Sequence, residues 1–300
     1  MGISENIIGV DLGGTNIRAG RVVENKIVQF SKERTPSNGT KQEVINSIFS
    51  AIDQCINSGT VGIGIGVPAV VDVEKGIVYD VTNIPSWNEV PLKEILQNKY
   101  QVPVSVNNDA NCFIVGEKFF GKGKLYNSIV GLALGTGLGC GLIFNGQLYE
   151  GRNCGAGEFG IIPYLDYNFE YYCSGQFFKK EKGIDAELAY IEAKAGNIIY
   201  ADYFREFGFH LGQVIKSMLY VYDPEIIIIG GSLTKAYELY KEAMFAAMQD
   251  LEFSNTLKRI KIEISELDNS AIFGAAGLFI NQSNIINRAE TLSVINTQVT

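Results

Sequence analysis

Two short glycine-containing turns recur between apolar, β-branched runs of this sequence. The first is Gly13-Gly14-Thr15-Asn16 and the second is Gly135-Thr136-Gly137. Glycine allows positive φ angles and the close approach of a ligand, so such turns can present backbone N–H groups to phosphate oxygens. A plain hairpin turn explains either copy alone, but two copies in equivalent places favour phosphate binding.

Acidic side chains stand beside the apolar runs at two points. Asp11 comes just before the first turn, where it is either a solvated strand end or a holder of hydrated Mg²⁺ beside the phosphates. Asn108 and Asp109 follow the buried run 102–106, and one of them serves as a helix N-cap. Because α/β folds bind ligands at the carboxyl ends of strands, Asp109 is placed to accept a proton from a substrate hydroxyl as a general base.

Three further features carry weaker signals. Glu158 lies among small residues, where it either accepts hydrogen bonds from neutral hydroxyls or is an exposed loop residue. Gly230-Gly231-Ser232 follows the apolar run 226–229 and resembles a nucleotide-binding turn at a strand end. The only histidine, His210, falls in an apolar helical pattern and is interpreted as structural, which excludes mechanisms that need several histidines.

Composition excludes several classes of protein. The 33 acidic residues outnumber the 25 basic ones, and this net charge of −8 argues against nucleic acid or an anionic membrane as a partner. Five cysteines without a C-x-x-C pair argue against a disulfide scaffold. The start of the chain lacks signal-peptide features, and the longest apolar stretch, 129–144, is interrupted by five glycines. We therefore expect a cytoplasmic protein with no membrane segment.

The elements that must position these residues form a repeated pattern. Strand, glycine turn, strand, turn and third strand are predicted over residues 7–30 and again over 128–149, each followed by helical and strand segments. Two copies in 300 residues predict a duplicated α/β fold of two lobes with a cleft between them, both glycine turns facing it. The polar stretch 281–300 is either a surface helix or a frayed tail.

Taken together, these motifs resemble the ROK family of bacterial sugar kinases and sugar-responsive repressors, within the actin-like ATPase superfamily. The resemblance runs from about Ile7 to Leu278, and the order and spacing of its pieces make it specific. It rests on the segments Gly9–Asn16, Gly64–Pro68, Asn83–Trp87, Asn108–Asn111, Leu134–Gly139, Gly155–Gly160, Asp223–Gly231 and Gly274–Ala276.

The resemblance implies a duplicated ribonuclease-H-like fold with a small N-terminal lobe, residues 1–118, and a large C-terminal lobe, 119–300, whose last helix packs back on the small lobe. It implies ATP and Mg²⁺, a sugar substrate, a homodimer, and phosphorylation of a hexose, with glucose giving glucose 6-phosphate as the leading reaction. By the same resemblance Asp109 is the catalytic base, the two turns bind phosphate and Gly230–Ser232 lies on the adenosine side. The sugar-binding positions that it implies are Asn83, Asn108, Glu158 and Glu170.

Two departures from the family pattern affect metal and sugar. Many members carry a zinc site with a histidine and a three-cysteine cluster, but Ile161 stands at the histidine position and residues 163–173 hold no such cluster. Structural zinc is therefore predicted absent. The missing histidine would also touch the sugar, and Ala69 replaces a glycine beside the sugar pocket, so both changes bear on which sugar is bound.

Other functions remain open at this point. The sugar of such a kinase can instead be N-acetylmannosamine, N-acetylglucosamine, fructose or a β-glucoside. A sugar-sensing regulator is a second class, but the first strand begins at about Ile7, so no helix-turn-helix domain is expected ahead of it. A sugar-binding protein without catalysis would leave Asp109 and both turns unexplained.

Overall fold

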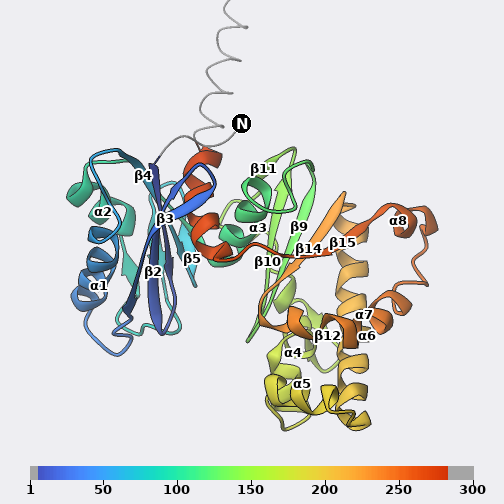
Figure 1. The fold of residues 1–300 in the computed structure, drawn as a ribbon. Coiled ribbons are helices and arrows are strands. Elements are labelled where there is room, and N and C mark those ends of the chain that lie inside the picture. Colours follow the sequence, from blue (N-terminus) through green and yellow to red (C-terminus); the bar gives the residue numbers. More distant parts are fainter. Residues whose placement is uncertain (1–5, 283–300) are drawn as a thin grey trace, which may run out of the picture.

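Two five-stranded mixed sheets organise residues 6–282, the part of the chain that this computed structural model describes (Figure 1). The N-terminal sheet has the strand order β3-β2-β1-β4-β8, in which β1, β2 and β3 are antiparallel neighbours and β1, β4 and β8 run parallel. Its strands are β1 (Asn6–Leu12), β2 (Asn16–Val23), β3 (Lys26–Arg34), β4 (Thr60–Val67) and β8 (Val104–Asn108).

The C-terminal sheet repeats this arrangement. Its strand order is β11-β10-β9-β14-β15, again with an antiparallel meander on one side and parallel strands on the other. The same connections in both sheets confirm the duplicated two-lobe α/β fold that the paired hairpins predict. The strands are β9 (Ile129–Leu134), β10 (Leu138–Phe144), β11 (Gln147–Leu148), β14 (Ile226–Gly230) and β15 (Lys261–Ile264).

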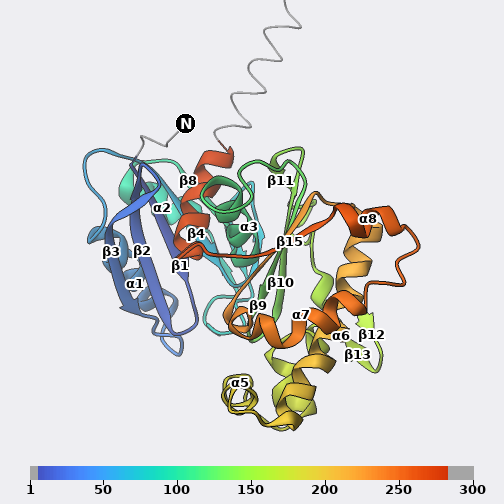
Figure 2. The same ribbon diagram turned by 45° about the vertical axis from the view of Figure 1, so that its right-hand side comes forward.

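Helices cover the outer faces of the sheets and enlarge the C-terminal lobe (Figures 1 and 2). Helix α1 begins after Thr40, whose side chain forms a capping box with Glu43. Helix α7 ends at Ala246. The helices are α1 (Lys41–Asp53), α2 (Leu92–Tyr100), α3 (Asp109–Phe119), α4 (Phe169–Tyr172), α5 (Ala186–Lys194), α6 (Ile198–Tyr222), α7 (Tyr237–Ala246) and α8 (Ser254–Arg259).

Short elements complete the two lobes. A three-stranded sheet flanks β8, a hairpin precedes α4, and irregular helical turns follow the loops. They are β5 (Val70–Asp72), β6 (Ile77–Tyr79), β7 (Glu89–Val90), β12 (Pro163–Tyr164), β13 (Tyr167–Asn168), the 3₁₀ helices Phe159–Ile161 and Ser232–Ala236, and the π-helical turn Phe177–Glu181. Over residues 6–282, no helix combines the length and the apolar character that a membrane crossing requires.

Two helices lie side by side between the sheets, and each packs on the sheet of the other lobe (Figures 1 and 2). Helix α3 leaves β8 of the N-terminal sheet, yet its Ile114 belongs to a cluster with Ile129 and Ile226 of the C-terminal sheet. A helix over residues 270–282 leaves the C-terminal sheet, yet its Ile272 packs with Ile7 of β1. The lobes therefore exchange a helix each.

Glycines allow this exchanged pair to approach in backbone contact. A Cβ added to Gly274 would lie 1.9 Å from the backbone oxygen of Cys112, and one on Gly64 of β4 would lie 1.7 Å from the oxygen of Ala275. Only glycine fits at either position. The expected lobe boundary at 118 falls at the end of α3, and residues 283–300 of the polar C-terminal stretch lie outside the described residues.

Candidate functional site

The first glycine turn joins β1 to β2 and is held by its carbonyl groups. Gly13 N donates to Asn16 O at 3.0 Å, Thr35 Oγ1 donates to Gly13 O at 2.7 Å, and Thr35 N donates to Thr15 O at 3.0 Å. The N–H groups of Gly14 and Thr15 have no acceptor within residues 6–282. Adjacent free N–H groups with the carbonyls already bonded suit an anion such as phosphate.

The second glycine turn joins β9 to β10 and is held in the same way by another segment. Gly175 N donates to Gly135 O at 2.7 Å, and Ser174 Oγ donates to Thr136 O at 3.1 Å. The N–H groups of Thr136 and Gly137 find no acceptor in the described chain. Each turn thus carries two adjacent N–H groups that have no acceptor among the described residues.

Two of the turn glycines, Gly14 and Gly137, are needed for space and not for a left-handed backbone. None of Gly13, Gly14, Gly135 and Gly137 has a positive φ, so the prediction that these turns use such angles is wrong. A Cβ on Gly14 would lie 3.0 Å from Cβ of Asn83, and one on Gly137 would lie 2.6 Å from Glu170 Oε2. Each turn therefore lies against a side chain predicted to bind sugar.

Asp11 is almost fully buried, with 8% of its surface exposed, so it is not a solvated strand end. Arg18 lies opposite it on β2 and donates to Asp11 Oδ2 through both Nε, at 2.9 Å, and Nη2. Oδ1 accepts no hydrogen bond from the described residues. One carboxylate oxygen is therefore left to bind a hydrated cation beside the first turn.

Asp109 lies at the corner where β8 ends and α3 begins. Asn108 is the N-cap of α3 and accepts from Ala110 N at 2.8 Å, which leaves Asp109 in the first turn of the helix. Its side chain is reached by solvent yet has protein around most of it, and this desolvation raises its pKa to about 6. The negative charges of Asp11 and Glu158 raise that pKa further, so these carboxylates lie near one another.

The remaining residues predicted to bind sugar lie near the second glycine turn and near Asp109. Glu170 Oε2 accepts from Leu138 N at 3.1 Å, and its Oε1 accepts from Gln176 Nε2 at 2.7 Å. Loss of surrounding water raises the pKa of Glu158, and the charge of Glu170 raises it further. Asn108 Nδ2 donates to Ala69 O at 3.3 Å, the position where the sequence departs from the family pattern.

The third glycine turn, Gly230–Ser232, lies beside the second turn at the end of β9. Gly230 of β14 pairs with Ala133 of β9, so the two strands end together. Gly231 has φ +91°, and a Cβ there would lie 2.2 Å from Leu134 O, which makes it a true glycine position. Ser232 Oγ lies 3.9 Å from the Cβ position at Gly135.

A magnesium ion fits this arrangement without a protein cage. Mg²⁺ keeps several waters and is commonly held by one or two carboxylates plus substrate phosphates, and Asp11 offers one free carboxylate oxygen. In residues 6–282, no three His, Cys, Asp or Glu side chains group as a metal site. Ile161 is 67% exposed ahead of the β12–β13 hairpin. The absence of structural zinc stays a prediction.

His210 and the cysteines lie apart from this chemistry. His210 is buried on α6, where its Nδ1 lies 3.1 Å from the hydroxyl of Tyr164 and its ring packs against Tyr172. Burial lowers its pKa, as expected for a structural histidine. All five cysteines are free and buried. The homodimer that the family resemblance implies stays a prediction.

Sequence reasoning missed three residues that hold the site together. Arg18 had a detectable signal, because Asp11 and Arg18 flank the first turn and fall opposite each other in a hairpin. Thr35 and Ser174 had none, since they lie 22 and 38 positions from the carbonyl groups that they bind. Only the folded chain shows that both turns are fastened by a hydroxyl.

Comparison with known proteins covers nearly the whole chain. The sequence pattern of the ROK family matches residues 7–282. A glucokinase of Thermotoga maritima is 30% identical over 91% of this chain and 96% of its own, and a xylose repressor of Bacillus subtilis is 28% identical over 91% and 77%. A Streptomyces griseus ROK glucokinase, solved with glucose and AMPPNP, matches with a TM-score of 0.77 at 27% identity, covering 91% of this chain and 98% of that one. Both sheets and every site residue above lie within the match, and the chain therefore belongs to the ROK family.

Proposed function

We propose that this protein is an ATP-dependent sugar kinase that phosphorylates a hexose hydroxyl, with Asp109 as the general base. One observation carries the proposal: Asp109, with its pKa raised to about 6, stands at a strand end near Asp11 and Glu158. A carboxylate of that pKa is ionised at neutral pH and is a better proton acceptor than an ordinary aspartate.

The surrounding residues divide the remaining tasks. The free N–H groups of the two turns suit the oxygens of the transferred phosphoryl chain, and Asp11 Oδ1 suits a hydrated Mg²⁺, which when bound would neutralise phosphate charge. Asn83, Asn108, Glu158 and Glu170 offer amide and carboxylate groups to sugar hydroxyls. Phosphoryl transfer depends mostly on positioning and charge stabilisation, which these groups supply.

Glucose is the substrate we favour, with glucose 6-phosphate as product. Relatives whose names include glucokinase support this choice, and one solved relative holds glucose together with an ATP analogue. N-acetylmannosamine, N-acetylglucosamine, fructose and β-glucosides are the other candidates, because Ile161 and Ala69 depart from the family pattern beside the sugar.

The test is a coupled assay of ADP release over a panel of these sugars. We expect turnover with glucose, and Asp109→Asn should lower kcat by about 10²–10⁴-fold because it removes the base while keeping an acceptor for Ala110 N. Asp185→Asn is the matched control, since Asp185 is another aspartate at a helix start and Asn also caps helices. Equal turnover in Asp109→Asn and the wild type would contradict the proposed base.

The xylose repressors among the relatives define the outcome that would replace this proposal. A sugar-sensing protein would bind sugar without releasing ADP. Isothermal titration with the same sugar panel separates the two, because binding without turnover in the presence of Mg²⁺ and ATP would exclude the kinase. A gel-shift titration at two salt concentrations would reveal DNA binding, which weakens steeply with salt.

A further inference from the structure

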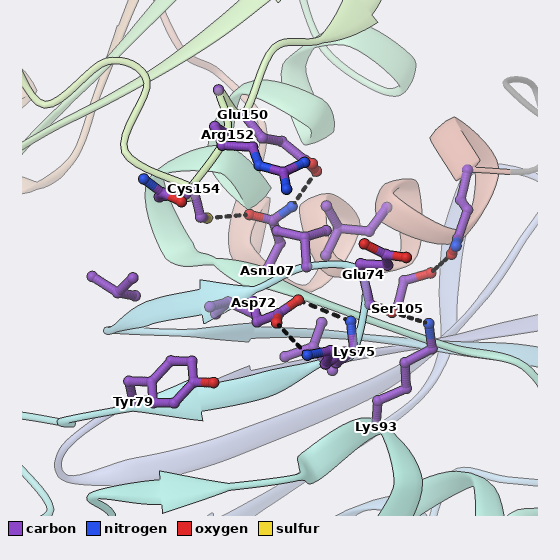
Figure 3. Close-up of a pocket in the computed structure, with 18 of the residues that line it drawn as sticks. Asp72, Glu74, Lys75, Tyr79, Lys93, Ser105, Asn107, Glu150, Arg152 and Cys154 are labelled. Atoms are coloured by element: carbon purple, nitrogen blue, oxygen red, sulfur yellow. Dashed lines mark hydrogen bonds and ion pairs between the residues drawn. The ribbon is translucent and has the colours of Figure 1, made fainter.

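Asn107 is a buried hydrogen-bonding centre directly before the catalytic corner. It ends the buried part of β8 with only 1% of its surface exposed. Its Oδ1 accepts from Asn108 N at 2.8 Å, from Asn111 Nδ2 at 2.9 Å and from Cys154 Sγ at 3.3 Å, while its Nδ2 donates to Glu150 Oε1 at 2.6 Å. Figure 3 shows Asn107 between Glu150 and Cys154.

These bonds fix which way the amide of Asn107 faces. The backbone N–H of Asn108 is a donor only, so the group facing it must be the oxygen, and the NH₂ group must face Glu150. A buried N–H needs an acceptor, and Glu150 supplies it. The orientation of the Asn107–Asn108 peptide, and hence of the corner that carries Asp109, depends on that carboxylate.

Glu150 also begins the segment that carries Glu158. Its backbone oxygen accepts from Ala156 N at 3.1 Å, and Cys154 of the same segment donates to Asn107. Asn107 thus links the corner that carries Asp109 to the segment that carries Glu158. We propose that Glu150 is a positioning residue that, through Asn107, holds Asn108 and Asp109 in register with the Glu158 segment. This proposal builds on the proposed kinase function.

A cavity borders this group, and Asp109 is not among the residues that line it. It has a volume of about 720 Å³ and is lined by β5, β8, residues 150–154 and the helix over residues 270–282 (Figure 3). Glu150 lines it together with Asp72, Glu74 and Arg152. Small solutes can therefore reach Glu150 without passing through the catalytic corner. A hole made by truncating Glu150 is open to an added carboxylate.

The experiment compares Glu150→Ala with Glu150→Gln, which keeps an acceptor oxygen for Asn107. We expect Glu150→Ala to lower kcat/KM for the sugar about tenfold, because displacement of a reacting group by a fraction of an ångström is costly, and Glu150→Gln to stay near the wild type. Acetate should restore activity to Glu150→Ala, whereas chloride at equal ionic strength should not. Glu74→Ala is the matched control, since its carboxylate lines the same cavity and makes no side-chain hydrogen bond among the described residues.

A second measurement does not depend on turnover. The ¹³C carboxyl signal of Asp109 should titrate near pH 6 in the wild type and at lower pH in Glu150→Ala, because a loosened corner admits water. A wild type without turnover would refute the kinase but leave this titration intact. Kinetics and titration equal to those of Glu74→Ala, or a fall in Tm with unchanged kcat/KM and no acetate effect, would overturn the positioning role.

Discussion

The two glycine hairpins occupy equivalent places in the two sheets but differ in charge. In the first, Asp11 lies opposite Arg18 across the strands. In the second, the opposing residues are Ala133 and Gly139, and a Cβ on Gly139 would lie 3.0 Å from Cβ of Ala110, next to Asp109. One hairpin therefore carries a charged group beside its turn, and the other leaves room for the helix that begins at Asp109.

This difference shows how a duplicated fold can divide one task. Both turns keep the feature that comes from backbone geometry, namely free N–H groups with fastened carbonyls. Side chains then distinguish the copies, since only the first has a carboxylate at this position.

Removing the charge of the first hairpin should have the largest effect. Asp11→Asn should lower kcat by about 10²–10³-fold, because a preorganised charge at the phosphate is lost, and should raise the Mg²⁺ concentration needed for half-maximal rate. Ala133→Ser, the matched polar change in the second hairpin, should leave both quantities close to the wild type. Steady-state kinetics over a Mg²⁺ series measure this, and equal losses in the two variants would remove the distinction.

Adding a methyl group to a turn glycine should have a smaller effect on activity than Asp11→Asn. The effect should be larger in the second turn than in the first. Gly137→Ala places a methyl group against Glu170 Oε2, which is held by two hydrogen bonds, so KM for the sugar should rise about tenfold. Gly14→Ala meets Cβ of Asn83 at the longer distance of 3.0 Å, so the overlap is smaller and KM should rise less. A larger rise in Gly14→Ala than in Gly137→Ala would reverse the comparison.

The dependence of kcat/KM on pH should show the effect of the Asp11 charge on the pKa of Asp109. Asp109 must be ionised to act as a base, so kcat/KM should fall tenfold per pH unit below a midpoint of about 6. Asp11→Asn removes a negative neighbour and should move that midpoint to lower pH, and Glu158→Gln should move it less. Ala133→Ser should not move the midpoint. An unchanged midpoint in Asp11→Asn would show that the charge of Asp11 does not affect the pKa of Asp109.

The smallest effect is expected where the hairpins are alike. Thr35→Val and Ser174→Ala each remove a buried hydroxyl that donates to a turn carbonyl, and each should lower the free energy of unfolding by about 1 kcal/mol. Urea denaturation of both variants measures the loss. A large difference between them would mean that the two turns are not fastened equivalently.

Much of this arrangement could be predicted from sequence because it is local. The hairpin duplication, the capping box of α1 and the strand-end position of Asp109 all depend on neighbours in the chain. The hydroxyls of Thr35 and Ser174, and the pairing of Asn107 with Glu150, could not, because tertiary packing alone brings them together. The turn glycines were found by their type, yet the neighbours that require them, Asn83 and Glu170, lie far along the chain.

The exchanged helices have a consequence for how the chain is made. The N-terminal sheet buries Ile7 against Ile272, so it lacks part of its core until residues 270–282 have been synthesised. Helix α3 is translated early but finds its cluster partners only when β9 and β14 follow. Neither lobe can therefore complete its folding on the ribosome before the other, and separately expressed halves should be soluble only when they are produced together.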